Sequence, residues 1–383
     1  MATETSYAPP PADSPTMTVA LKIWRYNAET GEKELRDYEV EAPDWACLLD
    51  VLDLIKDKVD GSLAYRKSCR MMICGSCGMR MDGRAVLACK ERMKPIVDRG
   101  HVPVISAMGN LPIIKDLVVD MDPFWGKVRS VKPWLDPGYD EPSEKERIVS
   151  QQQMNVIHKE ALCIMCGCCV SECNSMESDP DFMGPAALAK GFRFVGDPRD
   201  HAEVERLNVL NQEHGIWDCT RCYFCNERCP KGVDPRDAIA KLGAESIKHG
   251  IDHDMGAKHA KWFVKSAETT GWLRETELVP KTQGVVSAIK EVKFALKLLR
   301  HGKVPPPVPP HVAENVREAR ALHDLVREQG RDGALGIVQG ERGLARAEQQ
   351  ASEAEGAHGG WGNRDQADIT PGERPTAAKG AEA

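Results

Sequence analysis

Two runs of four cysteines constrain this chain more than any other feature. They are Cys163, Cys166, Cys169 and Cys173, then Cys219, Cys222, Cys225 and Cys229, with Pro230 directly after the last. Both runs read C-x2-C-x2-C-x3-C, the spacing that holds two cubane iron–sulfur clusters in bacterial-type ferredoxins. In such proteins each cluster takes three ligands from one run and the fourth from the other. The spacing therefore predicts one cluster on Cys163, Cys166, Cys169 and Cys229, and a second on Cys219, Cys222, Cys225 and Cys173.

A third set of cysteines lies upstream of these runs. Cys69, Cys74, Cys77 and Cys89 read C-x4-C-x2-C followed by a distant fourth cysteine, which is the plant-type [2Fe–2S] spacing. Gly75, Gly78 and Gly167 lie beside the ligands, where glycine lets a chain turn tightly and aim N–H groups at sulfur. Each of them equally suits an ordinary turn. The twelve spaced cysteines predict three clusters, and hence a chain of electron carriers.

Two cysteines fall outside these spacings. Cys168 is predicted to pack beside a cluster without binding it, and Cys47 to be a small core residue. Disulfides are the first alternative for so many cysteines, but disulfide scaffolds are usually small secreted chains. Zinc is the second alternative, although zinc sites usually use two separated pairs of cysteines. Two complete runs favour iron–sulfur ligation in a reducing compartment.

Composition excludes several classes of function. The 383 residues carry a formal net charge of −7, which gives no electrostatic footprint for nucleic acid. The apolar runs are too short to span a bilayer, so we expect no transmembrane helix. Residues 1–16 lack the basic and apolar segments of a secretory signal, and we expect them to be disordered.

The fold class expected is α+β, beginning with a β-grasp [2Fe–2S] ferredoxin domain over residues 17–125. Alternation predicts strands over 16–26 and near 35–40, and the turn Asp82-Gly83 predicts a hairpin that ends at Cys89. Another short strand is expected over 102–106. Asp44 is predicted to cap the helix that carries Leu48, Val51, Leu52 and Ile55.

An α-helical domain with two clusters is expected over residues 143–250. Ser143 and Glu146 predict a capping box at its first helix, and Asp234-Pro235 predict the start of a later helix that stops at Gly250. A helical extension over 255–329 includes a stiff proline-rich spacer at 305–310 and one more polar helix over 312–328. A disordered tail is expected over 330–383.

The extension contains a basic amphipathic pattern. Its apolar stripe is Val285, Ile289, Val292, Leu296 and Leu299, with Lys290, Lys293, Lys297 and Arg300 off that stripe. Such a helix suits a membrane surface or a partner protein, and it equally suits an ordinary helix that covers its own domain.

Residues 17–250 resemble the iron–sulfur subunits of succinate dehydrogenase and fumarate reductase. The resemblance rests on YRKSCRMMICGSC from Tyr65, LPIIKDLVVDMDPFW from Leu111, CIMCGCCVSEC, FMGPAALAKGFRFVGDPRD and CPKGVDP. It implies an electron-transfer subunit with no catalytic residue of its own, working in the tricarboxylic acid cycle. Electrons from the FAD of a flavoprotein subunit would reach quinone through a [2Fe–2S] cluster, a [4Fe–4S] cluster and a distal cluster.

The chain departs from that family in three ways. The family usually has a distal [3Fe–4S] cluster because one position of the second run is not cysteine, whereas this chain has Cys222, which predicts a distal [4Fe–4S] cluster. Of the family's usual quinone-site residues only Ser175 is retained, and Asn174 and Thr220 replace others. Residues 259–278 (HAKWFVKSAETTGWLRETEL) and LLRHGKVPPP are similar to heterodisulfide reductase C subunits.

These features point to the class in which a cysteine-rich subunit resembling heterodisulfide reductase B replaces a haem-bearing membrane anchor. The expected partners are the flavoprotein and either that subunit or a membrane anchor, with quinone reached indirectly. The expected location is the cytoplasm, peripheral on the cytoplasmic face of the inner (plasma) membrane. Fumarate reduction, or a thiol-linked reaction, is the alternative activity. A regulatory iron–sulfur protein is a third alternative, which the acidic composition disfavours.

Overall fold

The computed structural model describes residues 15–138, 146–303, 312–318, 320–321 and 324. The expectations for the proline-rich spacer and for the tail over 330–383 lie outside the described residues, as does nearly all of the segment 1–16. Within the described residues, no helix has the length and apolar character needed to cross a membrane.

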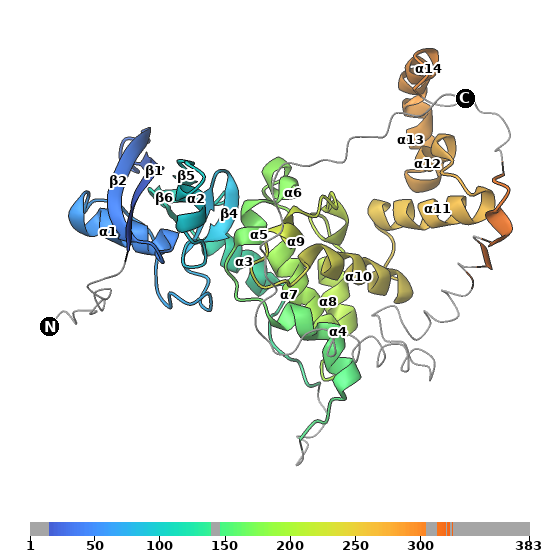
Figure 1. The fold of residues 1–383 in the computed structure, drawn as a ribbon. Helices are drawn as coiled ribbons and strands as arrows, with labels where there is room; N and C mark the ends of the chain where they lie inside the picture. The colour runs from blue at the N-terminus through green and yellow to red at the C-terminus, as the bar shows by residue number, and fades with distance from the viewer. Residues whose placement is uncertain (1–14, 139–145, 304–311, 319, 322–323, 325–383) are drawn as a thin grey trace, which may run out of the picture. The chain divides into compact units, whose positions relative to one another are not determined.

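The N-terminal region is a five-stranded mixed sheet with a longer helix and the short helix α2 (Lys94–Val97) packed on it (Figure 1). The strand order is β2-β1-β5-β3-β4, with β1 parallel to β5 and the other pairs antiparallel. Helix α1 (Leu48–Lys58) packs against β2 and buries the predicted stripe of Leu48, Val51, Leu52 and Ile55. The strands are β1 (Thr16–Tyr26), β2 (Lys33–Pro43), β3 (Gly78–Met81), β4 (Arg84–Leu87) and β5 (Val104–Ser106).

Alternation produces this sheet because every second residue of β1 faces the core. Val19, Leu21 and Ile23 are almost wholly buried, as the period of two requires. The predicted hairpin also forms, since Asp82 (φ 51°) and Gly83 (φ +75°) supply the two left-handed residues of its turn. A small second hairpin, β6 (Ile113–Lys115) with β7 (Val118–Val119), was not predicted.

A helical region follows the sheet and is built around α7 (Pro185–Val195). Nine residues of α7 are buried, and it packs against α3, α4, α8 and α10. The other elements of this region are α3 (Asp122–Ser130), α4 (Gln151–Ala161), α5 (Cys168–Ser171), α6 (Asn174–Ser178), α8 (Glu203–Leu210), η1 (Ile216–Asp218), α9 (Phe224–Glu227) and α10 (Pro235–Lys248). The mixture of sheet and helices is the α+β architecture expected.

Three predicted helix caps were wrong or incomplete. Helix α1 starts after Cys47 rather than at Asp44, and Cys47 is its cap residue, half-buried and packed against the sheet core as predicted. Its thiol lies 2.9 Å from Asp50 Oδ2, and burial, with this contact, raises the pKa of Cys47 to about 12. Of the predicted capping box, Ser143 lies outside the described residues and Glu146 lies in irregular chain. Helix α4 begins later and is capped by Ser150, whose hydroxyl accepts from the backbone amide of Gln153.

The third cap is that of α10. The helix begins at Pro235 and its last residue, Lys248, is followed closely by left-handed Gly250, as expected. The Asp234 carboxylate does not cap the helix, however, and pairs with the ammonium of Lys159 on α4 instead. This pairing ties the start of α10 to α4.

The extension is helical where it is described. It comprises α11 (Met255–Thr270), α12 (Glu275–Thr282), α13 (Val285–Lys290) and α14 (Val292–Arg300). The single helix implied by the apolar stripe is divided at Glu291, which ends α13 and caps α14. Part of the polar helix expected over 312–328 lies within the described residues, and it is helical from Val316.

Candidate iron–sulfur sites

The loop between α1 and β3 wraps around the sulfur of Cys69. Three backbone amides donate to Cys69 Sγ, from Met71 at 3.4 Å and from Ile73 and Cys74 at 3.3 Å. Cys69 in turn donates its amide to Cys74 Sγ at 3.5 Å. A ring of N–H groups around sulfur stabilises a thiolate, and it is the arrangement that tunes an iron–sulfur cluster.

The base of this loop is anchored by one carboxylate on α1. Asp53 is buried and accepts from Lys67 Nζ at 2.7 Å and from Arg70 at 2.5 Å, and it also accepts from the Tyr65 hydroxyl. The side chains of Lys67 and Arg70 therefore fix the loop that carries Cys69, because both converge on the same buried acceptor.

The other two cysteines of this set are Cys77 and Cys89. Cys77, at the start of β3, is buried, and its thiol shares a hydrogen bond with Cys89 beyond β4. Burial raises the pKa of Cys77 to about 12. For Cys74, burial raises the pKa, but hydrogen bonds from Ser76 and from backbone amides outweigh it and lower the pKa to about 6.

A cavity lies between the first cysteine run and the end of the second. It is bounded by the start of α7 on one side and by the Pro230–Pro235 segment on the other. The thiols that line it belong to Cys163, Cys166, Cys169 and Cys229. This is the crossed grouping expected from the spacing, with the fourth cysteine coming from 60 residues further along the chain than the third.

A second cavity has the reciprocal composition. Its thiols are Cys173, from the first run, with Cys219, Cys222 and Cys225 from the second. Ser175 and Thr220 link its two sides, since the Thr220 amide donates to Ser175 Oγ at 3.1 Å. Cys225 is buried whereas Cys222 is exposed, so this cavity has an open side at Cys222.

The two runs repeat one backbone conformation. Two residues after the first cysteine the chain is left-handed, at Met165 (φ 56°) and Arg221 (φ 57°). Four residues after it the chain is left-handed again, at Gly167 (φ +79°) and Tyr223 (φ 68°), and a short helix follows. Comparing the two runs residue by residue would have revealed Tyr223, which occupies a position that favours glycine.

Tyr223 keeps this conformation because its ring has a partner. The guanidinium of Arg236, on α10, lies 4.5 Å from the ring centroid, in the range of a cation–π interaction. Both residues line the second cavity. A strained residue at such a place is typical of a functional site, where surrounding contacts hold the strain.

The donor sets of both cavities fit iron–sulfur clusters. The sulfurs receive backbone hydrogen bonds, from Arg221 N to Cys219 Sγ and from Val233 N to Cys229 Sγ, both at 3.4 Å. Burial raises the pKa of Cys225 to about 12 and that of Cys169 well above its usual range. Such thiols ionise readily only beside metal ions, which deprotonate a coordinating thiol.

The [2Fe–2S] loop and the first cysteine run are in direct contact. A Cβ on Gly75 would lie 2.8 Å from both Cα and Cβ of Cys166, and one on Gly78 would lie 3.2 Å from the Cys166 carbonyl oxygen. Cys168 is fully buried in the hydrophobic core of the sheet region, which agrees with the predicted packing role. Close backbone approach at two glycines therefore places the [2Fe–2S] loop directly against the first cysteine run.

Polar contacts hold this junction in register. Arg80 Nε on β3 donates to Glu172 Oε1 at 2.9 Å, and the Gly109 amide donates to Ser171 Oγ at 3.0 Å. Asn110 Nδ2 bridges two carbonyl oxygens of the first run, on Val170 at 2.8 Å and on Cys173 at 2.9 Å. Sequence reasoning missed these residues because partners 60 or more positions apart leave no local pattern.

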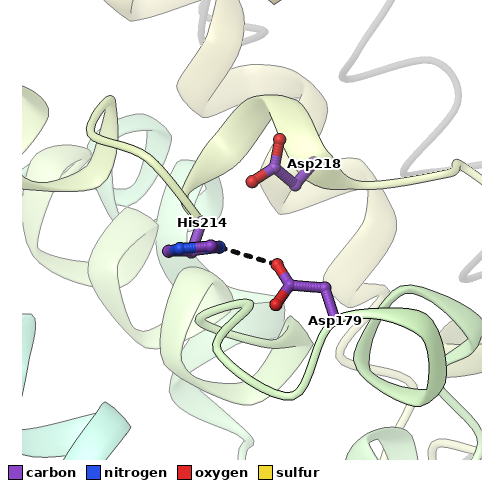
Figure 2. Close-up of side chains that lie close together, drawn as sticks. All are labelled: Asp179, His214 and Asp218. Carbon is purple, nitrogen blue, oxygen red and sulfur yellow. Dashed lines mark hydrogen bonds and ion pairs between the residues drawn. The ribbon is translucent and has the colours of Figure 1, made fainter.

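A further pair joins the two sides of the second cavity from outside. His214 Nδ1 lies 2.7 Å from Asp179 Oδ2, and Asp218 lies close by (Figure 2). The Met183 amide donates to the His214 carbonyl oxygen at 2.7 Å. The pair ties the chain after α6 to the chain before Cys219. Exposed acidic groups often gather in this way without an ion, so we interpret the pair as a structural link.

Comparisons with known proteins agree with this architecture. Residues 20–126 match a family described as a 2Fe-2S iron–sulfur cluster binding domain, and residues 161–233 match a 4Fe-4S dicluster domain. The chain is similar to the fumarate reductase iron–sulfur subunit of Haemophilus influenzae, with 39% identity over 250 residues, 62% of this chain and 95% of that protein.

Two further relatives and one solved structure extend the comparison. The 8-methylmenaquinol:fumarate reductase iron–sulfur subunit of Wolinella succinogenes is 32% identical over 289 residues, 74% of this chain and 90% of that protein. The succinate dehydrogenase iron–sulfur subunit of Coxiella burnetii is 35% identical over 234 residues, 60% of this chain and 97% of that protein. A chain of the Mycobacterium smegmatis Sdh1 complex in the apo form matches with a TM-score of 0.57 and 26% identity, covering 62% of this chain and 99% of that one. The cysteine spacing, the two matched domains and these relatives together place the chain in the family of succinate dehydrogenase and fumarate reductase iron–sulfur subunits.

Proposed function

We propose that the twelve spaced cysteines hold three clusters in an electron-transfer subunit. The ligands proposed are Cys69, Cys74, Cys77 and Cys89 for a [2Fe–2S] cluster, Cys163, Cys166, Cys169 and Cys229 for a [4Fe–4S] cluster, and Cys173, Cys219, Cys222 and Cys225 for a distal [4Fe–4S] cluster. The observation that carries this proposal is the reciprocal exchange of Cys229 and Cys173 between the two cavities. When bound, the clusters carry single electrons between redox partners.

The protein's own contribution is to fix and tune the sulfurs. Backbone amides donate to Cys69, Cys219 and Cys229, and such donors stabilise the charge on sulfur and raise a cluster's reduction potential. The close approach at Gly75 shortens the path between the first two sulfur sets. The exposure of Cys222 leaves the distal site open toward an electron acceptor or donor.

The distal site is proposed to be [4Fe–4S] rather than [3Fe–4S]. Cys222 lines the same cavity as Cys173, Cys219 and Cys225, so a fourth thiol is available there. Electron paramagnetic resonance (EPR) of undamaged, air-oxidised protein tests this assignment. A [3Fe–4S] signal at full stoichiometry would contradict it, and its absence is the expected result.

The partners proposed are a FAD-bearing flavoprotein subunit and a subunit that delivers electrons to quinone. Subunits of this family work in succinate dehydrogenase or fumarate reductase complexes, so partner subunits are part of its function. We propose the class with a cysteine-rich partner resembling heterodisulfide reductase B. Its support is Cys222 in the distal site, together with the similarity of residues 259–278 to heterodisulfide reductase C subunits.

We propose succinate oxidation as the activity of the complex and a place on the cytoplasmic face of the membrane. Fumarate reduction is the second candidate, favoured by relatives named fumarate reductase at 39–40% identity. The test is affinity purification from native membranes with identification of partners and addition of succinate. Co-purification of a covalent flavoprotein, with cluster absorption bleached by succinate, is expected. A cluster-loaded preparation without flavoprotein would contradict the proposal.

A further inference from the structure

The segment α13–α14 has an apolar face that no described residue covers. No side chain of α14 is buried, and only Leu298 is even half-buried. Phe294 is 58% exposed, Leu296 is 51% exposed and Val292 is 47% exposed. On α13, Val286 and Ile289 are more exposed still. Scattered exposed apolar residues are normal, but a row of them along one helix indicates an interaction surface.

The residues of α14 separate by chemistry around the helix. At 100° per residue, six apolar residues share one continuous arc, and the basic residues occupy a narrow arc opposite. The apolar residues are Val292, Phe294, Ala295, Leu296, Leu298 and Leu299, and the basic residues are Lys293, Lys297 and Arg300. Lys290 precedes the helix and Lys303 follows it, while Glu291 is the one acidic residue of the segment 285–303.

We propose that α14 is a lipid-contacting helix that lies on an anionic membrane surface. An apolar face with Phe and Leu, flanked by Lys and Arg, is the composition of interfacial helices, whose lysines reach the headgroups while the apolar face enters the acyl boundary. A protein partner fits less well, because protein interfaces are depleted in lysine. The whole chain has a net charge of −7, whereas the segment 285–303 has five basic residues and one acidic residue. The positive charge that would attract an anionic surface is therefore local to this segment.

The proposal is separate from the electron-transfer function. Helix α14 contains no cysteine, and vesicle binding and cluster reduction are independent measurements. With only nine residues, α14 is about 14 Å long, so its binding is expected to be reversible and to act together with the other subunits.

The test is sedimentation of the full, cluster-loaded chain with vesicles. Phosphatidylcholine vesicles that contain phosphatidylglycerol are expected to bind the chain, with affinity that falls as salt rises, and pure phosphatidylcholine vesicles are expected to bind it weakly. The triple variant Lys293→Gln, Lys297→Gln, Arg300→Gln is expected to weaken binding roughly 100-fold, taking about fivefold for each charge. Phe294→Ser is expected to weaken it as well, and to do so at high salt too.

The matched control removes three exposed cations from the sheet region, through Lys58→Gln, Arg84→Gln and Lys115→Gln. It lowers the net charge equally and is expected to leave binding within a few-fold of the parent. Equal loss in the control would overturn the proposal, since bulk charge would then explain binding. Failure of the parent to bind anionic vesicles would overturn it. The proposal would also be overturned if Phe294→Ser released a co-purifying protein and left vesicle binding unchanged. That protein, and not the membrane, would then cover the apolar face. All variants change exposed residues, and unchanged cluster absorption reports that they are folded.

Discussion

Replacing Gly75 with alanine is expected to damage the junction between the [2Fe–2S] loop and the first cysteine run. Gly75 has φ +72°, where a Cβ costs about 1–2 kcal/mol. The new Cβ would also lie 2.8 Å from the backbone Cα of Cys166 and 3.1 Å from the Ile164 carbonyl oxygen, so backbone must move. Overpacking of this kind costs about 1–3 kcal/mol more.

Gly31 provides a matched control because it has the same φ of +72° and nothing within 4 Å of the added Cβ. Alanine there keeps the dihedral cost but gains about 0.4–1 kcal/mol from the stiffer unfolded chain, leaving a net cost of about 1 kcal/mol. Gly75→Ala should therefore cost about 1–3 kcal/mol more than Gly31→Ala. With roughly 2–4 °C for each kcal/mol in domains of 150–250 residues, the difference is at least about 2 °C.

The assay follows the loss of visible cluster absorption on heating, at one scan rate for both variants because metalloprotein unfolding is often irreversible. A second measurement uses EPR to compare the magnetic interaction between the first two clusters. Gly75→Ala is expected to weaken this interaction, and Gly31→Ala is expected to leave it unchanged. If the two variants melted within about 1 °C of each other and their EPR spectra were unchanged, the reasoning would be refuted. The close contact at Cys166 would then not constrain the junction.

Three further perturbations test other parts of the account. Cys222→Ser is expected to convert the distal cluster to a [3Fe–4S] form, seen as a new EPR signal in oxidised protein, while the other clusters keep their signals. Arg206→Leu is expected to destabilise the helical region by about 3–5 kcal/mol, measured as earlier thermal loss of the clusters, because it leaves the fully buried Asp200 carboxylate without its partner at 2.8 Å. Asp179 raises the pKa of His214. The pair therefore contributes its full stabilisation below about pH 6.5, the ordinary pKa of histidine, and this stabilisation is lost as the pH rises through the raised pKa of the folded protein. Asp179→Asn is therefore expected to lower the melting temperature at pH 6 and to have no effect at pH 9.

Each of these has an internal control. Cys168→Ala should leave the iron content unchanged, because Cys168 packs in the sheet core and lines neither cavity. Arg36→Leu removes an exposed arginine whose closest carboxylate, on Glu34, is also exposed, so it should cost less than about 1 kcal/mol. A loss of stability from Arg36→Leu as large as that from Arg206→Leu, or an Asp179→Asn effect that grows with pH, would contradict the assignments.

The sequence predicted most where the signal was repeated or periodic. Alternation located β1, and the Asp82-Gly83 turn located the hairpin, because both depend on local backbone preference. The grouping of Cys229 with the first run could be expected from spacing alone, since a crossed two-cluster arrangement fixes which cysteines meet. The assignment of each cysteine to a cluster stays a prediction until the clusters are measured.

The sequence predicted least where several residues compete for one role. Asp44 is a good cap residue by type, yet Cys47 holds that position, since packing of the apolar stripe decides where a helix starts. The junction built by Arg80 and the left-handed Tyr223 depends on partners distant in the chain, on Glu172 and on α10. Only a three-dimensional structure brings such partners together.

The central claim is that three clusters lie on these twelve cysteines in the crossed arrangement. Mössbauer and EPR spectra of the native complex, repeated on Cys229→Ser and Cys173→Ser, test it most directly. The account predicts one [2Fe–2S] and two [4Fe–4S] clusters in the parent, with Cys229→Ser altering only the cluster of the first run and Cys173→Ser only that of the second. If Cys229→Ser instead altered the cluster of its own run, with Cys219, Cys222 and Cys225, the crossed arrangement would be contradicted.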